Sequence, residues 1–132
     1  MKIATTIGEL YNYFQTPAEA IKCYAGTGFK YLDYSFYYDH KGDSPFLLDD
    51  GSHWQNQVKA ALDAADECGF KFVQAHAPGY NPLSKSDYGR SLRAMCRSVE
   101  ACGKLGIPNV VVHTSFGLQH LYPMDKEPYF EY

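Results

Sequence analysis

A short segment that occurs three times in the chain carries the residues best suited to chemistry. The three copies are GFKYLDY at 28–34, GFKFVQAH at 69–76 and GIPNVVVH at 106–113. The fifth residue after each glycine is Asp33, Gln74 or Val111, and the seventh is Ser35, His76 or His113. Carboxylates and imidazoles hold polar ligands and transfer protons near neutral pH. Asp33, His76 and His113 are therefore candidate site residues.

The apolar middle of each copy predicts a β-strand, and the stretches between the copies predict helices. The opening glycines recur about every forty residues, which indicates a repeated supersecondary unit. Capping boxes predict helix starts at Thr16 and Ser52, and the first of these helices is expected to end between Cys23 and Gly26. Apolar spacing predicts helices over 52–68 and after Ser86. The expected buried stripe of the last helix is Leu92, Met95, Cys96, Val99 and Cys102.

With a first strand over residues 2–7, strands and helices alternate along a single domain of 132 residues. Such alternation predicts an α/β fold of parallel (β/α) units. Two architectures stay open at this point: a doubly wound sheet, and part of an eight-stranded (β/α)8 barrel. No glycine-rich phosphate-binding turn follows any predicted strand, which disfavours a doubly wound nucleotide-binding domain.

The seventh position of each copy falls at the carboxyl end of its strand, where parallel α/β folds keep their active sites. Positions five and seven point to one side, because side chains alternate along a strand. His76 and His113 are therefore expected to project into one pocket beside Asp33. Structural alternatives exist: either histidine could be a hydrogen-bonded packing residue, and Asp33 could serve an ion pair or a helix cap.

Two loops at the same end of the predicted sheet are long, aromatic and polar. They cover residues 34–50 and 77–82, and the second contains Tyr80 and Asn81. Aromatic faces stack on the C–H groups of a polyol, while polar groups bind its hydroxyls. We expect Tyr80 and Asn81 to take part in a sugar-binding site.

Composition disfavours several other partners. The chain has 12 basic and 15 acidic residues, a net charge of -3 and no run of Lys or Arg, which argues against nucleic acid. The N-terminus lacks the apolar segment of a signal peptide or membrane span, so we expect a cytoplasmic protein without a membrane partner. Its four cysteines form no C-x-x-C pair and are expected to be reduced and buried.

Residues 127–132 have the pattern of the first turn of a fourth helix, with Asp125 as its cap. One turn of helix cannot cover a preceding strand. We therefore expect a partial barrel that is truncated before this helix is complete. The alternative is a half-barrel that acts as a binding module and self-associates as a homodimer to cover its edge strands.

Three motifs, GFKYLDY, QAHAPGYNP and VVVHTS, resemble the first four strands of xylose isomerase-like (β/α)8 barrels. This superfamily comprises sugar phosphate isomerases and epimerases and also includes endonuclease IV. The similarity spans the whole chain but only half of such a barrel, which has roughly 250 residues. It implies the N-terminal half of a metal-dependent sugar or sugar phosphate isomerase or epimerase. Asp33 matches the acidic residue of strand two, and His76 and His113 match substrate-holding histidines after strands three and four.

The resemblance also implies a divalent metal, Mn, Mg, Co or Zn, for the full-length enzyme. In the isomerase branch, strands five to eight supply most of the metal ligands and the proton-abstracting carboxylates. We therefore expect this half to be inactive alone and to pair with a C-terminal half. In the endonuclease branch His76 and His113 would themselves be zinc ligands, which is the alternative. The acidic balance and the aromatic loops favour a sugar over DNA.

Overall fold

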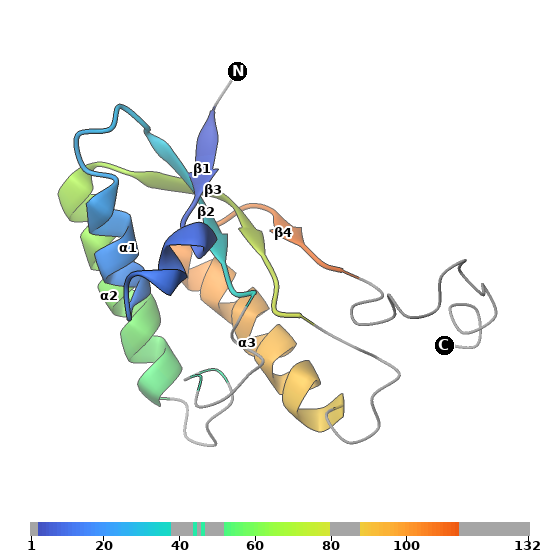
Figure 1. Cartoon of the computed structure of the whole chain (residues 1–132). Coiled ribbons are helices and arrows are strands. Elements are labelled where there is room, and N and C mark those ends of the chain that lie inside the picture. Colours follow the sequence, from blue (N-terminus) through green and yellow to red (C-terminus); the bar gives the residue numbers. More distant parts are fainter. Residues whose placement is uncertain (1–2, 38–43, 45, 47–51, 80–87, 114–132) are drawn as a thin grey trace.

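Four parallel strands form one sheet, and three α-helices alternate with them along the chain (Figure 1). The computed structural model describes residues 3–37, 44, 46, 52–79 and 88–113. Its elements are β1 (Ala4–Thr6), the 3-10 helix η1 (Gly8–Asn12), α1 (Pro17–Cys23), β2 (Tyr31–Ser35), α2 (Ser52–Cys68), β3 (Lys71–His76), α3 (Tyr88–Leu105) and β4 (Val110–Val111). The predicted α/β fold of (β/α) units is confirmed; η1 was not predicted.

The strands lie in the order β1-β2-β3-β4, so each pairs with the next one along the chain. A doubly wound sheet instead reverses its strand order at a switch point. Crossovers between parallel strands are right-handed, and three that proceed in one direction place their helices on the same face of the sheet. In agreement, α1 packs against α2 and α2 against α3 (Figure 1). These three helices therefore do not cover the other face of the sheet.

The core lies between the sheet and the helices. On β2 and just after it, Leu32, Tyr34 and Phe36 are fully buried toward the helices. The Tyr34 ring centroid lies 4.4 Å from that of Phe36 and 5.6 Å from that of Phe72. Because side chains alternate along a strand, Asp33 and Ser35 point to the opposite face. The sheet is thus apolar on the helix side and polar on the other.

The start of α1 matches its predicted capping box. The Thr16 hydroxyl accepts a hydrogen bond from the Glu19 backbone N–H at 3.3 Å, and the Glu19 carboxylate accepts one from the Thr16 backbone N–H at 3.1 Å. Pro17 occupies the first helical turn, where its missing N–H costs nothing. This short helix therefore begins at a position fixed by local sequence.

The helix predicted over 52–68 is confirmed as α2, which begins at Ser52. The capping box predicted at Ser52 stays a prediction, because the residue before it lies outside the described residues. The glycines after α2 and α3 end these helices as expected, since Gly69 and Gly106 have φ values of 71° and 65°. These left-handed conformations suit glycine at a helix C-terminus.

The predicted buried stripe of α3 is largely wrong. Leu92 and Val99 are 41% and 52% exposed, and Cys96 is exposed as well. The residues that α3 buries are mostly small: Ser91, Ala94, Ser98, Ala101, Cys102 and Leu105. The Ser98 hydroxyl donates to the Met95 backbone carbonyl at 2.7 Å, so it is satisfied within the helix. Small side chains let α3 approach its neighbours closely, which a search for large apolar residues overlooks.

All four cysteines are free thiols, as expected, but only some are buried. Cys102 is buried, whereas Cys23 at the end of α1 and Cys96 on α3 are exposed. The expectation of general burial is therefore wrong, because helical spacing alone did not identify which face of each helix meets the core.

No helix in the described part of the chain has both the length and the apolar character needed to cross a membrane. Tyr80, Asn81 and the helix start expected over 125–132 lie outside the described residues.

Candidate functional site

Strands β2 and β3 bring two polar side chains together on the face opposite the helices. Asp33 is the register partner of Gln74, and the Gln74 side-chain amide donates to the Asp33 carboxylate at 3.0 Å. Leu32 pairs with Phe72, so Val73 is an extra residue that shifts the register. This bulge is what places the fifth position of the first repeat opposite that of the second. The predicted equivalence of Asp33 and Gln74 is confirmed.

Asp33 also contacts His76, at the carboxyl end of β3. Nδ1 of His76 lies 3.2 Å from Oδ1 and 3.0 Å from Oδ2 of Asp33. An ionised carboxylate can only accept, so Nδ1 carries the proton and donates it to this bond. The side chain of Asp33 is 12% exposed and that of His76 is 35% exposed. Asp33 thus fixes the orientation of the His76 ring through Nδ1, and Nε2 is the ring nitrogen that does not contact Asp33.

His113 lies beside His76, as expected, but not at an equivalent register position. The two ring centroids are 5.9 Å apart, and the ring planes differ by 22°. His76 pairs with Val111, so His113 comes two residues beyond its partner. The equivalence inferred from the glycines is therefore wrong by two residues, because neighbouring strands of a parallel sheet are staggered. An even offset keeps both side chains on one side of the sheet.

An open pocket of about 450 Å³ adjoins this network at the carboxyl ends of β1, β2 and β3. Its described lining consists of Thr6, Gly8, Glu9, Asp33, Ser35, Tyr37 and His76; His113, which was expected to share the pocket, is not part of that lining. Thr6, Gly8 and Glu9 were not predicted as site residues, whereas Tyr37 belongs to the aromatic loop over 34–50 that was. The first strand lacks the glycine-led repeat, so its end was not aligned with the other strand ends. The run T-I-G-E directly after that strand was the available signal.

Gly8 makes the rim of this pocket possible. A Cβ at this position would lie 2.8 Å from both Cβ and Oγ of Ser35, and Ser35 is buried. The Gly8 backbone N–H donates to the Thr6 hydroxyl at 3.2 Å, and the Tyr11 hydroxyl donates to the Ser35 carbonyl at 3.0 Å. These bonds hold η1 directly against the end of β2.

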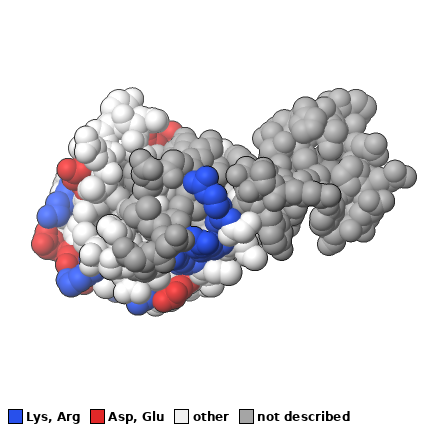
Figure 2. Space-filling view, turned by 90° about the horizontal axis from the view of Figure 1, so that it is seen from below, with Lys and Arg blue, Asp and Glu red and all other residues white. Residues whose placement is uncertain are grey.

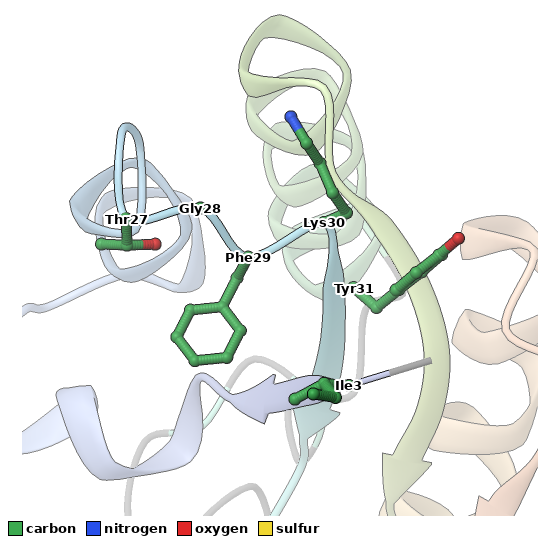
Figure 3. A pocket seen from close by; sticks show the side chains of 6 residues that line it. All are labelled: Ile3, Thr27, Gly28, Phe29, Lys30 and Tyr31. Carbon is green, nitrogen blue, oxygen red and sulfur yellow. The ribbon is translucent and has the colours of Figure 1, made fainter. Parts of the chain in front are cut away.

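A second hollow, of about 420 Å³, lies at the amino ends of β1 and β2 (Figure 3). It is lined by Ile3, Thr27, Gly28, Phe29, Lys30 and Tyr31. In Figure 3 the Lys30 side chain points away from the Phe29 ring, so its amine and the ring do not converge. The hollow lies at the end of the strands opposite to the pocket beside Asp33 and His76, and no carboxylate is among its described lining residues.

The surface around the site is mixed in charge. Figure 2 looks from below toward the end where β2 and β3 finish. Acidic and basic side chains alternate along the left and lower edges of the described surface, and a group of basic side chains lies near the centre of the view. Within the described ranges, no group of three or more His, Cys, Asp or Glu side chains could hold a metal ion. The residues of this site therefore do not make a metal centre by themselves.

Comparison of the chain with protein-family models, with curated proteins and with solved structures finds no match.

Proposed function

We propose that this chain is the N-terminal part of a sugar or sugar phosphate isomerase or epimerase and supplies one wall of its substrate site. The observation that carries the proposal is the buried Asp33 carboxylate, which holds both Gln74 and His76 at the carboxyl ends of the strands. Burying a carboxylate is costly unless its hydrogen bonds are satisfied. Here the network orients one imidazole toward an open pocket.

The chemistry of the pocket suits a polyol. Hydroxyl groups of Thr6 and Ser35 both donate and accept, and the carboxylates of Glu9 and Asp33 accept. Sugar hydroxyls also do both, so they match this lining. Nε2 of His76 can accept a proton from a sugar hydroxyl while Asp33 stabilises the resulting imidazolium. His113 extends the imidazole surface beside it.

The described residues do not fit a complete metal site, so no metal-dependent step is assigned to them. Isomerisation also requires a base that removes a proton from a carbon atom of the sugar. We assign this base to a carboxylate outside the described residues, on further (β/α) units or on a partner that would face this side of the sheet. We therefore expect the chain alone to bind a sugar without converting it.

Ligand-observed NMR tests the proposal. The purified chain is titrated with a panel of aldoses, ketoses and their phosphates, with and without Mg²⁺ or Mn²⁺. We expect saturation transfer to at least one sugar, and we expect His76→Asn to weaken binding about tenfold or more, because it removes an oriented hydrogen-bonding group. His53→Asn, on the exposed start of α2, is the matched control. Absence of transfer to every sugar would refute the proposal.

A further inference from the structure

The pocket beside Asp33 and His76 has a negative lining. Two of its residues, Glu9 and Asp33, carry carboxylates, and the described lining contains no Lys or Arg. Among the described lining residues, the two carboxylates outnumber the single group that could carry a positive charge, the imidazole of His76. Glu9 is exposed in the first turn of η1, where its charge faces solvent and any bound ligand.

The hydrogen-bond acceptors of the lining also favour a neutral sugar over a phosphate. Asp33 already accepts from Gln74 and His76, and Glu9 adds two further acceptor oxygens. A sugar hydroxyl donates a proton to such acceptors. A phosphate dianion offers only acceptors and carries negative charge, so it would be repelled by carboxylates placed beside it.

The described cations near this end of the molecule belong to the helix layer. Arg90, Arg93 and Arg97 are on α3, and Nη1 of Arg97 donates to the Phe46 backbone carbonyl at 2.9 Å. Figure 2 shows Lys and Arg side chains at the outer surface in this view. None of these arginines lines the pocket.

We propose that this pocket takes an uncharged polyol, that is, an unphosphorylated sugar, and that Glu9 is a selectivity residue that disfavours phosphorylated ligands. This inference rests on the proposed function and narrows its substrate class. It assigns Glu9 a role that does not depend on how the reaction at carbon proceeds.

The test compares D-fructose with D-fructose 6-phosphate by the same ligand-observed NMR titration, at about 50 mM and about 500 mM KCl. We expect the neutral ketose to bind at least about tenfold more tightly at low salt. The phosphorylated ligand should gain affinity at high salt, because screening weakens its repulsion, whereas the neutral ligand should not. Inorganic phosphate should not displace the ketose.

Glu9→Gln tests the role of Glu9 and keeps the shape of the side chain. We expect it to raise the affinity for fructose 6-phosphate relative to fructose severalfold. Glu100→Gln, at an exposed position on α3, removes the same charge away from the pocket and should leave that ratio unchanged. An equal change in both variants would overturn the role of Glu9.

The outcomes separate this inference from the proposed function. Binding of fructose 6-phosphate as tight as or tighter than that of fructose overturns the inference and leaves the sugar site standing. Failure of both ligands, together with failure of the whole sugar panel, overturns both proposals. If the protein prefers fructose 6-phosphate and loses this preference in Lys30→Gln, the ligand binds at the opposite hollow, which would also overturn the inference.

Discussion

At the scale of single residues, Asp33 is the group on which the site depends. It is a buried carboxylate that accepts hydrogen bonds from the Gln74 amide and from Nδ1 of His76. Neither donor is part of the backbone ladder, so the carboxylate is what orients both side chains. Its contribution therefore concerns the stability of the fold as well as the direction of the His76 ring.

Replacement of Asp33 by alanine should destabilise the protein. Asp33→Ala leaves the half-buried donors of Gln74 and His76 without their acceptor, and we expect a loss of about 1–3 kcal/mol in the free energy of unfolding. Asp63→Ala is the matched control: its exposed carboxylate pairs with Lys59 at 2.6 Å on α2, a contact worth about 0.3–0.5 kcal/mol. Urea denaturation measures both variants, and equal losses would contradict the structural role of Asp33.

The cysteines should differ sharply in reactivity. Burial raises the pKa of the Cys102 thiol to about 11, whereas Cys23 and Cys96 are exposed. At pH 8 we expect iodoacetamide to modify Cys23 and Cys96 in the native protein and Cys102 only in denaturant, because the thiolate is the reactive form. Peptide mapping by mass spectrometry reads this out. Native-state labelling of Cys102 as fast as that of Cys96 would show that α3 is not packed as described.

The raised pKa of Cys102 should also make the stability of the protein depend on pH in the alkaline range. The folded protein retains the Cys102 proton to about pH 11, while the thiol of the unfolded chain loses it near its ordinary pKa of 9.0. The folded state therefore binds more protons in this range, and the contribution of Cys102 to the free energy of unfolding falls as the pH rises from about 9 toward about 11. Cys102→Ala should show a shallower alkaline loss of stability in urea titrations; an identical slope would contradict this.

At the scale of elements, η1 is the part that shapes the pocket. It follows β1 directly, and its Gly8 lies against Ser35 at the end of β2. The Thr6 hydroxyl and the Tyr11 hydroxyl tie the two ends of this turn to the strands. Glu9 reaches the pocket only because Gly8 permits this close approach.

Two glycine substitutions should have opposite effects. Gly8→Ala forces a Cβ to within 2.8 Å of Ser35, so η1 must shift, and we expect a loss of about 1–3 kcal/mol together with weaker sugar binding. Gly103→Ala, in α3 with no atom near its added Cβ, should stabilise the helix by up to about 1 kcal/mol. Thermal unfolding compares the two variants. A Gly8→Ala protein as stable as the wild type would show that η1 is not packed against β2.

The elements were largely predictable from sequence, because their signals are local. The Thr16 capping box and the glycines after α2 and α3 fixed where helices start and end. Register was less predictable: the bulge at Val73 and the two-residue offset of β4 are set by strand stagger, which local spacing does not encode. The buried face of α3 was missed because it is made of small residues, and η1 because no repeat marks the end of β1.

At the scale of the whole molecule, the sheet has one helical layer and one polar face. The helices cover the apolar side, and Asp33, Gln74 and His76 occupy the other. The sequential strand order is that of the wall of a (β/α) barrel, in which this polar face would point inward. In the half-barrel that we propose, the proposed sugar site and the face that would meet further (β/α) units are the same surface.

The most direct test of the account is to locate a bound sugar by amide chemical-shift changes in ¹H–¹⁵N spectra during titration with D-fructose. We expect the changes to centre on Gly8, Ser35, Tyr37 and His76, and we expect His76→Asn to require about tenfold or more sugar to produce them. The amides of Gly28, Phe29 and Lys30, in the hollow at the opposite end of the sheet, should stay unchanged. Changes confined to that hollow, or unaltered by His76→Asn, would contradict it.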